Sequence, residues 1–257
     1  MKTKKGEILS AKTETKRDSK NIKEREVLYK LFKDRPIDTT DLLLNPGLFM
    51  RSGVLTKILF LNEVYQMILG TPGIIMEFGT WLGQNLITFE NLRAIYEPFD
   101  QTRRIIGFDS YSGYTAFSDK DKKDDVVKEG GYKVPEDYQK YLLELAKYHE
   151  QNNVLGYGKR IRTIAGDVTE TVPAFFEKYP ETIIAFAYFD MALYEPTKVC
   201  LREIKPHLVS GSVILLDEFN YEQWPGETLA FKEVCKDWSY VIKKSKLMTD
   251  RTFLVIN

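Results

Sequence analysis

The sequence predicts an α/β protein built on a doubly wound, mostly parallel sheet, with helices before it and an antiparallel hairpin at its C-terminal end. After residue 71, short apolar runs alternate with segments of helix length, a pattern typical of parallel strands that are buried on both faces. The runs end in or next to acidic residues, and two further apolar runs near the C-terminus are separated by a short lysine-rich stretch. The five alternating runs are IIMEF, RRIIGFD, IRTIAGD, IIAFAYFD and SVILLDE.

Helices are expected ahead of the sheet. Apolar residues recur at helical spacing over residues 24–32 and 54–69, with proline and glycine between them. We therefore predict a helical region over residues 24–70 and a main domain over residues 71–257, in which residues 240–242 and 252–256 pair as the final hairpin. Residues 1–23 are charged and carry few apolar side chains, so they are expected to form a flexible, solvated tail.

The composition disfavours several classes of function. A chain of 257 residues is long enough for one large domain, and its 37 basic residues balance 37 acidic ones, so no nucleic-acid partner is expected. No apolar run follows the first lysines, so neither a secretory signal nor a membrane anchor is predicted, and a cytoplasmic location is expected. Cys200 and Cys235 lack the neighbouring Cys or His of a structural zinc site and are expected to be buried free thiols.

A long insertion interrupts the alternation of strands and helices over residues 110–159. It is rich in Asp, Lys, Gly and Tyr, and it includes a helical stretch over residues 138–149. A connection of this length is uncommon in a compact domain. Because it follows the end of a strand, where open α/β sheets bind their ligands, we interpret it as a lid over a substrate; a variable excursion is the alternative. Its tyrosines could stack on a sugar ring or a base, or pack against the protein.

Glu77, Gly79 and Gly83 form a candidate cofactor loop after the first run. Glycine allows the backbone to approach a ligand closely, and the free amides of a helix that begins near Leu82 favour an anionic group. The spacing is not that of a dinucleotide fingerprint, and no lysine follows as in a phosphate-binding loop. A tight turn explains two glycines after a strand equally well.

Two further acids end the next runs. Asp109 ends the second run, where a carboxylate can accept hydrogen bonds from both hydroxyls of a ribose. Gly166 and Asp167 close the third run, and an acid there could accept a hydrogen bond from an adenine amino group. For Asp167 an N-cap of the following helix is an equal alternative.

The fourth and fifth runs end at Asp190 and at Asp217 with Glu218. Neighbouring strands lie about 4.8 Å apart, so acids at the same level repel one another unless a cation or a proton lies between them. Magnesium takes oxygen ligands and keeps waters that vicinal hydroxyls of a substrate could displace. We predict a magnesium site at Asp190 and Asp217, with a weaker case for Glu218; a helix cap or a lysine partner is the alternative.

These features together resemble class I S-adenosylmethionine-dependent methyltransferases, and more narrowly the macrocin O-methyltransferase (TylF-like) family of sugar O-methyltransferases. The resemblance extends from residue 74 to the C-terminus. Its most specific blocks are FDMALYEPT over residues 189–197 and LLDEF over residues 215–219. The other blocks are EFGTWLGQN, GFDSYSGY, AGD and WPGETLAFKE.

The resemblance implies a Rossmann-like fold and a magnesium-dependent transfer of a methyl group from S-adenosylmethionine to a sugar hydroxyl. It implies that Asp190, Asp217 and Glu218 bind the metal, with Asp190 and Glu218 also acting in catalysis. At the positions of Asp217 and Glu218 the family more often has two adjacent aspartates, so Glu218 departs from the family pattern. The cofactor contacts that it implies are Glu77, Gly79, Thr80, Trp81, Gly83, Asp109, Ser110, Gly166, Asp167 and Asp190.

Ala192 departs from the family pattern, in which this position is commonly an aspartate suited to act as a general base. Residues two apart in an extended strand end point to the same side, so an acid at 192 would share the side of Asp190. A positioned base typically contributes about 10²- to 10⁴-fold to the rate. Another group could act as the base, namely Glu218, Tyr194 or His149. Alternatively, the metal alone could suffice to activate the hydroxyl. The third interpretation, which we favour, is that the base has been removed from this chain.

The sequence therefore predicts an O-methyltransferase that acts on a sugar hydroxyl of a nucleotide sugar, a glycan or a glycosylated small molecule. A catechol-like acceptor and a catalytically silent cofactor-binding protein are the alternatives, and the glycine spacing disfavours an oxidoreductase. No membrane partner is expected. The helical region before residue 70 could cover the site or join two subunits in a homodimer. His207, near a helix end, is expected to be structural.

Overall fold

The computed structural model of the chain describes residues 19–257. Most of the predicted tail over residues 1–23 lies outside the described residues, and helix α1 (Ser19–Lys33) begins within its last few positions. The described residues divide into two compact units, one that ends at Lys57 and one over Ile58–Asn257. The predicted helical region over residues 24–70 thus contributes to both units.

The first unit contains α1 and short helices that the sequence pattern did not reveal. Helix α2 (Thr39–Leu44) is capped by Asp38, whose carboxylate accepts a hydrogen bond from the Asp41 amide. The 3-10 helix η1 (Pro46–Phe49) begins with proline, which suits the first turn because its missing N–H would have no partner there. Both helices are too short to show an apolar period, so only Pro46 and Gly47 of η1 stood out in the sequence.

The second unit is built on a seven-stranded sheet in the order β3-β2-β1-β4-β5-β7-β6. Strands β1 to β5 pair in parallel, and β7 pairs antiparallel with both β5 and β6. The doubly wound sheet and the final hairpin are therefore confirmed. The strand bounds are β1 (Ile74–Phe78), β2 (Ile105–Asp109), β3 (Ile161–Ala165), β4 (Ile184–Phe189), β5 (Leu208–Leu216), β6 (Tyr240–Lys244) and β7 (Thr252–Ile256).

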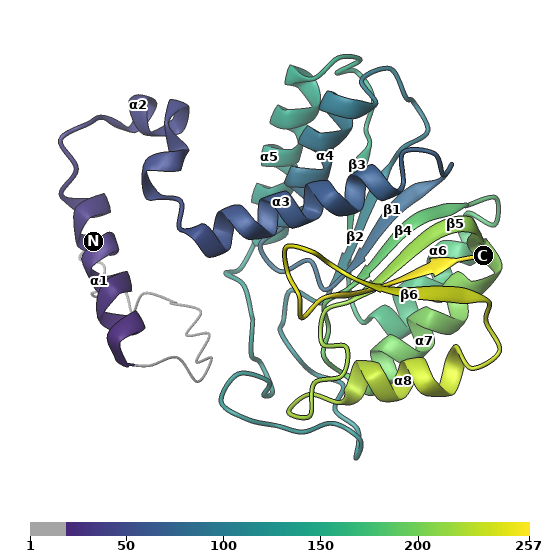
Figure 1. Ribbon diagram of the computed structural model, residues 1–257. Helices are drawn as coiled ribbons and strands as arrows, with labels where there is room; N and C mark the ends of the chain where they lie inside the picture. The colour runs from purple at the N-terminus through teal and green to yellow at the C-terminus, as the bar shows by residue number, and fades with distance from the viewer. Residues whose placement is uncertain (1–18) are drawn as a thin grey trace. The chain divides into compact units, whose positions relative to one another are not determined.

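Helices cover both faces of this sheet (Figure 1). Residues of β1 alternate between the two faces: Ile74, Met76 and Phe78 join one core cluster, whereas Ile75 joins the other. The first cluster also takes in side chains of α6, α7 and α8, and the second those of α3, α4 and α5. The helix bounds are α3 (Ser52–Met67), α4 (Gln84–Tyr96), α5 (Tyr138–Asn152), α6 (Val168–Lys178), α7 (Tyr194–Ile204) and α8 (Gly226–Val234).

The register of the central strands sets the place of the site. Phe78 at the end of β1 pairs with Phe189 at the end of β4, and Phe189 pairs with Leu216 at the end of β5. The residues that follow these three strands therefore start at the same level of one sheet edge. The strand order reverses between β1 and β4, and such a switch point is where open α/β sheets bind ligands.

The predicted insertion consists of two different parts. Residues 110–137 contain no helix or strand, whereas α5 packs Leu142 and Ala146 into the core cluster that covers β1 and β2. Helix α5 is thus the regular connection between β2 and β3, and only the loop is an excursion.

Both cysteines are buried and free, as predicted. Among the described residues, no helix has the length and apolarity needed to cross a membrane.

Candidate functional site

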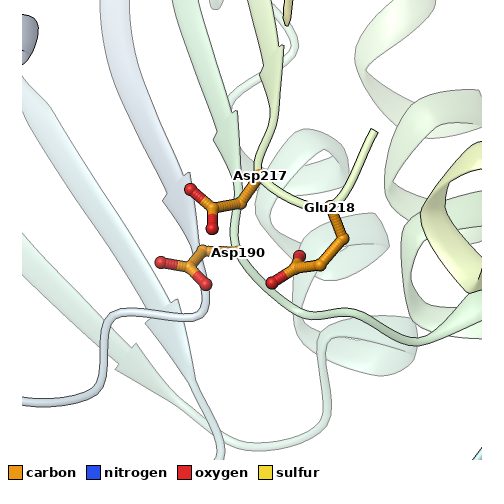
Figure 2. Close-up of side chains that lie close together, drawn as sticks. All are labelled: Asp190, Asp217 and Glu218. Carbon is orange, nitrogen blue, oxygen red and sulfur yellow. The ribbon is translucent and has the colours of Figure 1, made fainter. Parts of the chain in front are cut away.

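Three carboxylates meet at the carboxyl edge of the sheet. Asp190 follows β4, and Asp217 and Glu218 follow β5. Figure 2 shows the three side chains close together. One carboxylate oxygen from each residue lies within 4.8 Å of those of the other two. The acids that the sequence placed at neighbouring strand ends are therefore brought together in one cluster.

The cluster fits a divalent cation with oxygen ligands. An octahedral magnesium ion with ligands at about 2.1 Å holds its ligand oxygens about 3 to 4 Å apart. Oxygens that all lie within 4.8 Å of one another need only small side-chain movements to reach that arrangement. Three carboxylates would leave further positions for water or a substrate hydroxyl, where a metal supplies Lewis acidity.

The surroundings of the cluster are partly buried and strongly polar. Asp217 Oδ1 accepts a hydrogen bond from Tyr188 at 2.6 Å and forms an ion pair with Arg251 at 2.7 Å. Burial, and then the charges of Glu227, Asp217 and Asp190, raises the pKa of Glu218 well above its usual value. A cation among these acids would favour the ionised form of Glu218.

The candidate cofactor loop is fixed by contacts within the chain. Gly79 and Gly83 have φ angles of 91° and 74°. A Cβ on Gly79 would lie 2.1 Å from the Asp190 carbonyl oxygen, and a Cβ on Gly83 would lie 2.5 Å from the Leu142 side chain. Both positions therefore require glycine for the turn and its close packing, as in the tight-turn interpretation. Their contact with a cofactor stays a prediction.

Asp109 stabilises the candidate cofactor loop by accepting hydrogen bonds from backbone amides. Its two carboxylate oxygens accept hydrogen bonds from the amides of Trp81 at 2.7 Å and Tyr111 at 2.6 Å. Burial raises the pKa of Asp109, and hydrogen bonds from the backbone of Trp81, Tyr111 and Thr80 oppose that shift. Each carboxylate oxygen has a second lone pair, so the predicted ribose contact remains compatible with these bonds.

The other predicted cofactor residues have structural partners as well. Glu77 is fully buried and accepts a hydrogen bond from Asn85 at 2.5 Å. Thr80 is also buried and donates to the Phe108 carbonyl at 3.3 Å. Ser110 donates to the Gly113 carbonyl at 2.9 Å. None of these bonds tests a cofactor contact.

The third strand end combines a glycine turn with a helix cap. Gly166 has a φ of 134°, a conformation that favours glycine. Asp167 is the N-cap of α6 and accepts a hydrogen bond from the Thr169 amide at 2.8 Å. The capping interpretation of Asp167 is confirmed, and its contact with adenine stays a prediction.

Ala192 does not share a side with Asp190 by strand alternation, so this expectation was wrong. Strand β4 ends at Phe189, and Ala192 lies in a left-handed turn with a φ of 58°. Its side chain is 3% exposed and packs in an apolar cluster with Val126 and Val127 of the insertion. Position 192 therefore lies at the boundary between the acidic cluster and the insertion loop.

The insertion loop is fastened to the rim of the site. Asp121 accepts a hydrogen bond at 2.7 Å from the amide of Tyr194, the first residue of α7. Lys122 donates to the Glu222 carbonyl at 2.7 Å, and Asp124 accepts from the Trp224 indole at 3.0 Å. These contacts join residues 121–124 to the start of α7 and to the segment between β5 and α8, which begins at the acidic cluster.

Two tyrosines of the insertion lie within electrostatic reach of the acids. Burial, and then the charges of Asp190 and Glu218, raises the pKa of Tyr132 to about 12. Burial, followed by the same two acids, raises the pKa of Tyr114 well above its usual value. Both phenols therefore stay protonated near neutral pH and can donate hydrogen bonds. Tyr132 also packs edge-on against Trp81 of the candidate cofactor loop, with ring centroids 5.5 Å apart.

Two of the alternative bases make contacts outside the acidic cluster. His149 lies near the end of α5 beside Asn91, at 3.2 Å. The next residue, Glu150, accepts a hydrogen bond from the amide of Ile161 at the start of β3. His149 therefore lies near the amino ends of the parallel strands, opposite the carboxyl ends that carry the acids, and cannot serve as the general base. The Tyr194 hydroxyl donates to Glu233 of α8. His207 contacts the Thr182 carbonyl at 2.8 Å and stacks on a phenylalanine ring, a structural role as expected.

Sequence reasoning missed two charged residues at the site. Arg251 comes from the loop between β6 and β7, and nothing in its local sequence connects it with Asp217. Glu227 is fully buried in α8 together with Ala230 and Phe231. That spacing places a glutamate on the apolar stripe of a helix, which is an anomaly that the sequence could have revealed.

Comparisons with known proteins place this geometry in a family. No protein-family model matches the sequence, and no curated protein matches it significantly. A crystal structure of the calicheamicin methyltransferase CalS11 is 36% identical, with 93% of each chain covered and a TM-score of 0.88. A second CalS11 structure, described as the apo form of a TDP-rhamnose 3'-O-methyltransferase, is 34% identical over 93% of this chain and 95% of that one, with a TM-score of 0.81.

A more distant structure shares the fold alone. The O-methyltransferase NovP is 17% identical over 79% of this chain and 80% of its own, with a TM-score of 0.58. The resemblance to class I methyltransferases that the sequence blocks suggested is confirmed by the two CalS11 structures. The chain therefore belongs to the class I S-adenosylmethionine-dependent O-methyltransferases, in the family that includes CalS11.

Proposed function

We propose that the chain transfers a methyl group from S-adenosylmethionine to a sugar hydroxyl, with a divalent cation held by Asp190, Asp217 and Glu218. The observation that carries the proposal is the carboxylate cluster at the carboxyl edge of the sheet, whose oxygens lie within 4.8 Å of one another. Its place beside the loop after β1 supports a donor site next to an acceptor site. The CalS11 structure at 34% identity is described as a TDP-rhamnose 3'-O-methyltransferase, which favours an acceptor of the nucleotide-sugar class.

The residues of the chain have distinct roles in this proposal. The loop from Glu77 to Gly83 and the carboxylate of Asp109 hold the donor, and Asp167 lies on the adenine side. The three acids orient the acceptor hydroxyl. When bound, the cation supplies Lewis acidity that makes this hydroxyl easier to deprotonate. The protonated phenols of Tyr114 and Tyr132 donate hydrogen bonds to the acceptor from the insertion.

Catechol-like diols are the second candidate acceptors, because vicinal phenolic oxygens suit the same acidic cluster. The insertion favours a sugar, because its loop is joined to the segments around the acidic cluster, and the phenols of Tyr114 and Tyr132 can donate hydrogen bonds to the several hydroxyls of a sugar. A panel that includes TDP-rhamnose, other nucleotide sugars and catechol distinguishes the two classes.

The test is methyl transfer measured by the mass of the product. With S-adenosylmethionine and magnesium, we expect a nucleotide sugar to gain one methyl group, catechol to remain unchanged, and EDTA to abolish the gain until magnesium is restored. Methylation of catechol and of no nucleotide sugar would show that the acceptor is a phenol and not a sugar. Full activity in EDTA, after prior removal of bound metal, would contradict the role of the cation.

A further inference from the structure

Glu227 joins the two segments that carry the acidic cluster. One of its carboxylate oxygens accepts hydrogen bonds from the amides of Met191 at 3.0 Å and Ala192 at 3.1 Å. The other oxygen accepts from the amide of Glu218 at 3.1 Å. Met191 and Ala192 follow Asp190 directly, so a single side chain holds the segment after β4 and the segment after β5.

The geometry suits an anion at this position. The consecutive amides of Met191 and Ala192 converge on one oxygen, and Ala192 itself has a φ of 58°; such an arrangement forms a concavity of the kind that binds anions. Glu227 also lies in the first turn of α8, where the helix dipole favours negative charge. The carboxylate is fully buried, and its hydrogen bonds therefore do not compete with water.

The start of α8 has no room to shift against these segments. A Cβ on Gly226 would lie 2.4 Å from the Ala192 carbonyl oxygen and 2.6 Å from the Tyr194 amide nitrogen. Helix α8 therefore packs directly on the turn that follows Asp190. A fixed helix with a fixed carboxylate determines how far apart the two segments lie.

We infer that Glu227 is a positioning residue that sets the separation of Asp190 and Glu218, and thereby the affinity of the cluster for a divalent cation. This inference rests on the proposed function. Glu227 itself points at backbone amides and not into the cluster, so it acts through the two acids. Polar groups that orient metal ligands are typically worth about 10- to 100-fold in metal affinity.

Glutamine is the most informative replacement at this position. It has nearly the same shape, but one carboxylate oxygen becomes an NH₂ group that faces a backbone N–H. Two donors cannot bond each other, so one of the two segments loses its anchor while the other keeps it. Aspartate keeps the charge and both acceptors but is one methylene shorter, so it reaches only one segment.

The experiment measures Mn²⁺ binding to the full chain in saturating S-adenosylhomocysteine, by electron paramagnetic resonance of the free ion. The variants are Glu227→Gln, Glu227→Asp and Asp190→Asn, with Glu177→Gln as a matched control on the exposed face of α6. We expect Glu227→Gln and Glu227→Asp to weaken Mn²⁺ binding by about 10- to 100-fold, with unchanged affinity for S-adenosylhomocysteine. The control should bind Mn²⁺ as the wild type does.

The outcomes separate this inference from the proposed function. If the wild type does not bind Mn²⁺, or binds it no more tightly than Asp190→Asn does, the proposed metal site is wrong, and the inference about Glu227 fails with it. If the wild type binds Mn²⁺ but folded Glu227→Gln and Glu227→Asp bind it equally well, only the inference about Glu227 is overturned. The inference is also overturned if both variants fail to fold, because the carboxylate then supports the core and not the site.

Discussion

The backbone at Ala192 suits aspartate or asparagine better than alanine. Its φ of 58° is left-handed, a conformation that short polar side chains adopt more readily than alanine does. The position adjoins the acidic cluster through Asp190 and the insertion through Val126. This local geometry supports the hypothesis that a base has been removed from position 192, which rests on the departure from the family pattern. Only the argument from strand alternation was wrong.

We expect Ala192→Asp to raise the turnover number for methyl transfer without changing the affinity for S-adenosylhomocysteine. A positioned base typically contributes about 10²- to 10⁴-fold. Ala192→Asn is the matched control, because asparagine fits the same turn and has nearly the same volume but cannot accept a proton. Equal turnover in Ala192→Asp and Ala192→Asn would show that no base belongs at this position.

The acids that end strands were predictable from the sequence, and the residues that hold them were not. Asp190 and Asp217 follow apolar runs, and parallel strands bring their carboxyl ends to one edge. Arg251 reaches Asp217 only because β7 inserts between β5 and β6, an order that local patterns do not specify. Glu227 lies in the WPGETLAFKE block, but its role depends on three backbone amides that only the folded turns bring together.

At the scale of elements, α7 receives its cap from the insertion. The N-cap of α7 is Leu193, which makes no side-chain capping bond, and the carboxylate of Asp121 accepts the hydrogen bond from the Tyr194 amide instead. An insertion that satisfies a helix end gains a defined resting place over the rim of the site. The hydrogen bond from the Tyr194 amide to Asp121 thus anchors the predicted lid to the start of α7.

We expect Asp121→Ala to lower the free energy of unfolding by about 0.5 to 2 kcal/mol, the usual cost of a lost cap. It should also speed proteolytic cleavage within residues 115–130 and raise the KM for the sugar acceptor, with unchanged binding of S-adenosylhomocysteine. Asp119→Ala, at an exposed neighbouring position, is the control for the change in charge. Identical proteolysis and KM in both variants would contradict a fastening role for Asp121.

The regular elements were largely predictable because each has a clear period. All seven strands fall where apolar runs occur, and α5 begins at Tyr138 as expected. The helices α2 and η1 were missed because their six and four residues are too few to display a helical stripe. The path of residues 110–137 could not be predicted, since it is fixed by single polar contacts such as that of Asp124 with Trp224.

At the scale of the whole molecule, ligand choice should appear in thermal stability. A ligand that binds only the folded state at about 100 times its Kd adds about 2.7 kcal/mol, which raises the unfolding midpoint of a chain of this size by about 5 to 10 °C. We expect that shift with S-adenosylhomocysteine and none with NAD, measured by differential scanning calorimetry. A shift with NAD alone would overturn the choice of cofactor.

The most direct test of the account is the rate of methyl transfer from S-adenosyl-[methyl-¹³C]methionine to TDP-rhamnose, followed by NMR in wild type and Asp190→Asn. The account predicts a new ¹³C O-methyl signal on the sugar with the wild type in magnesium, and a loss of that signal in Asp190→Asn although the variant stays folded. Transfer that is equally fast in Asp190→Asn would contradict the account, as would a wild type that binds the donor yet methylates no sugar.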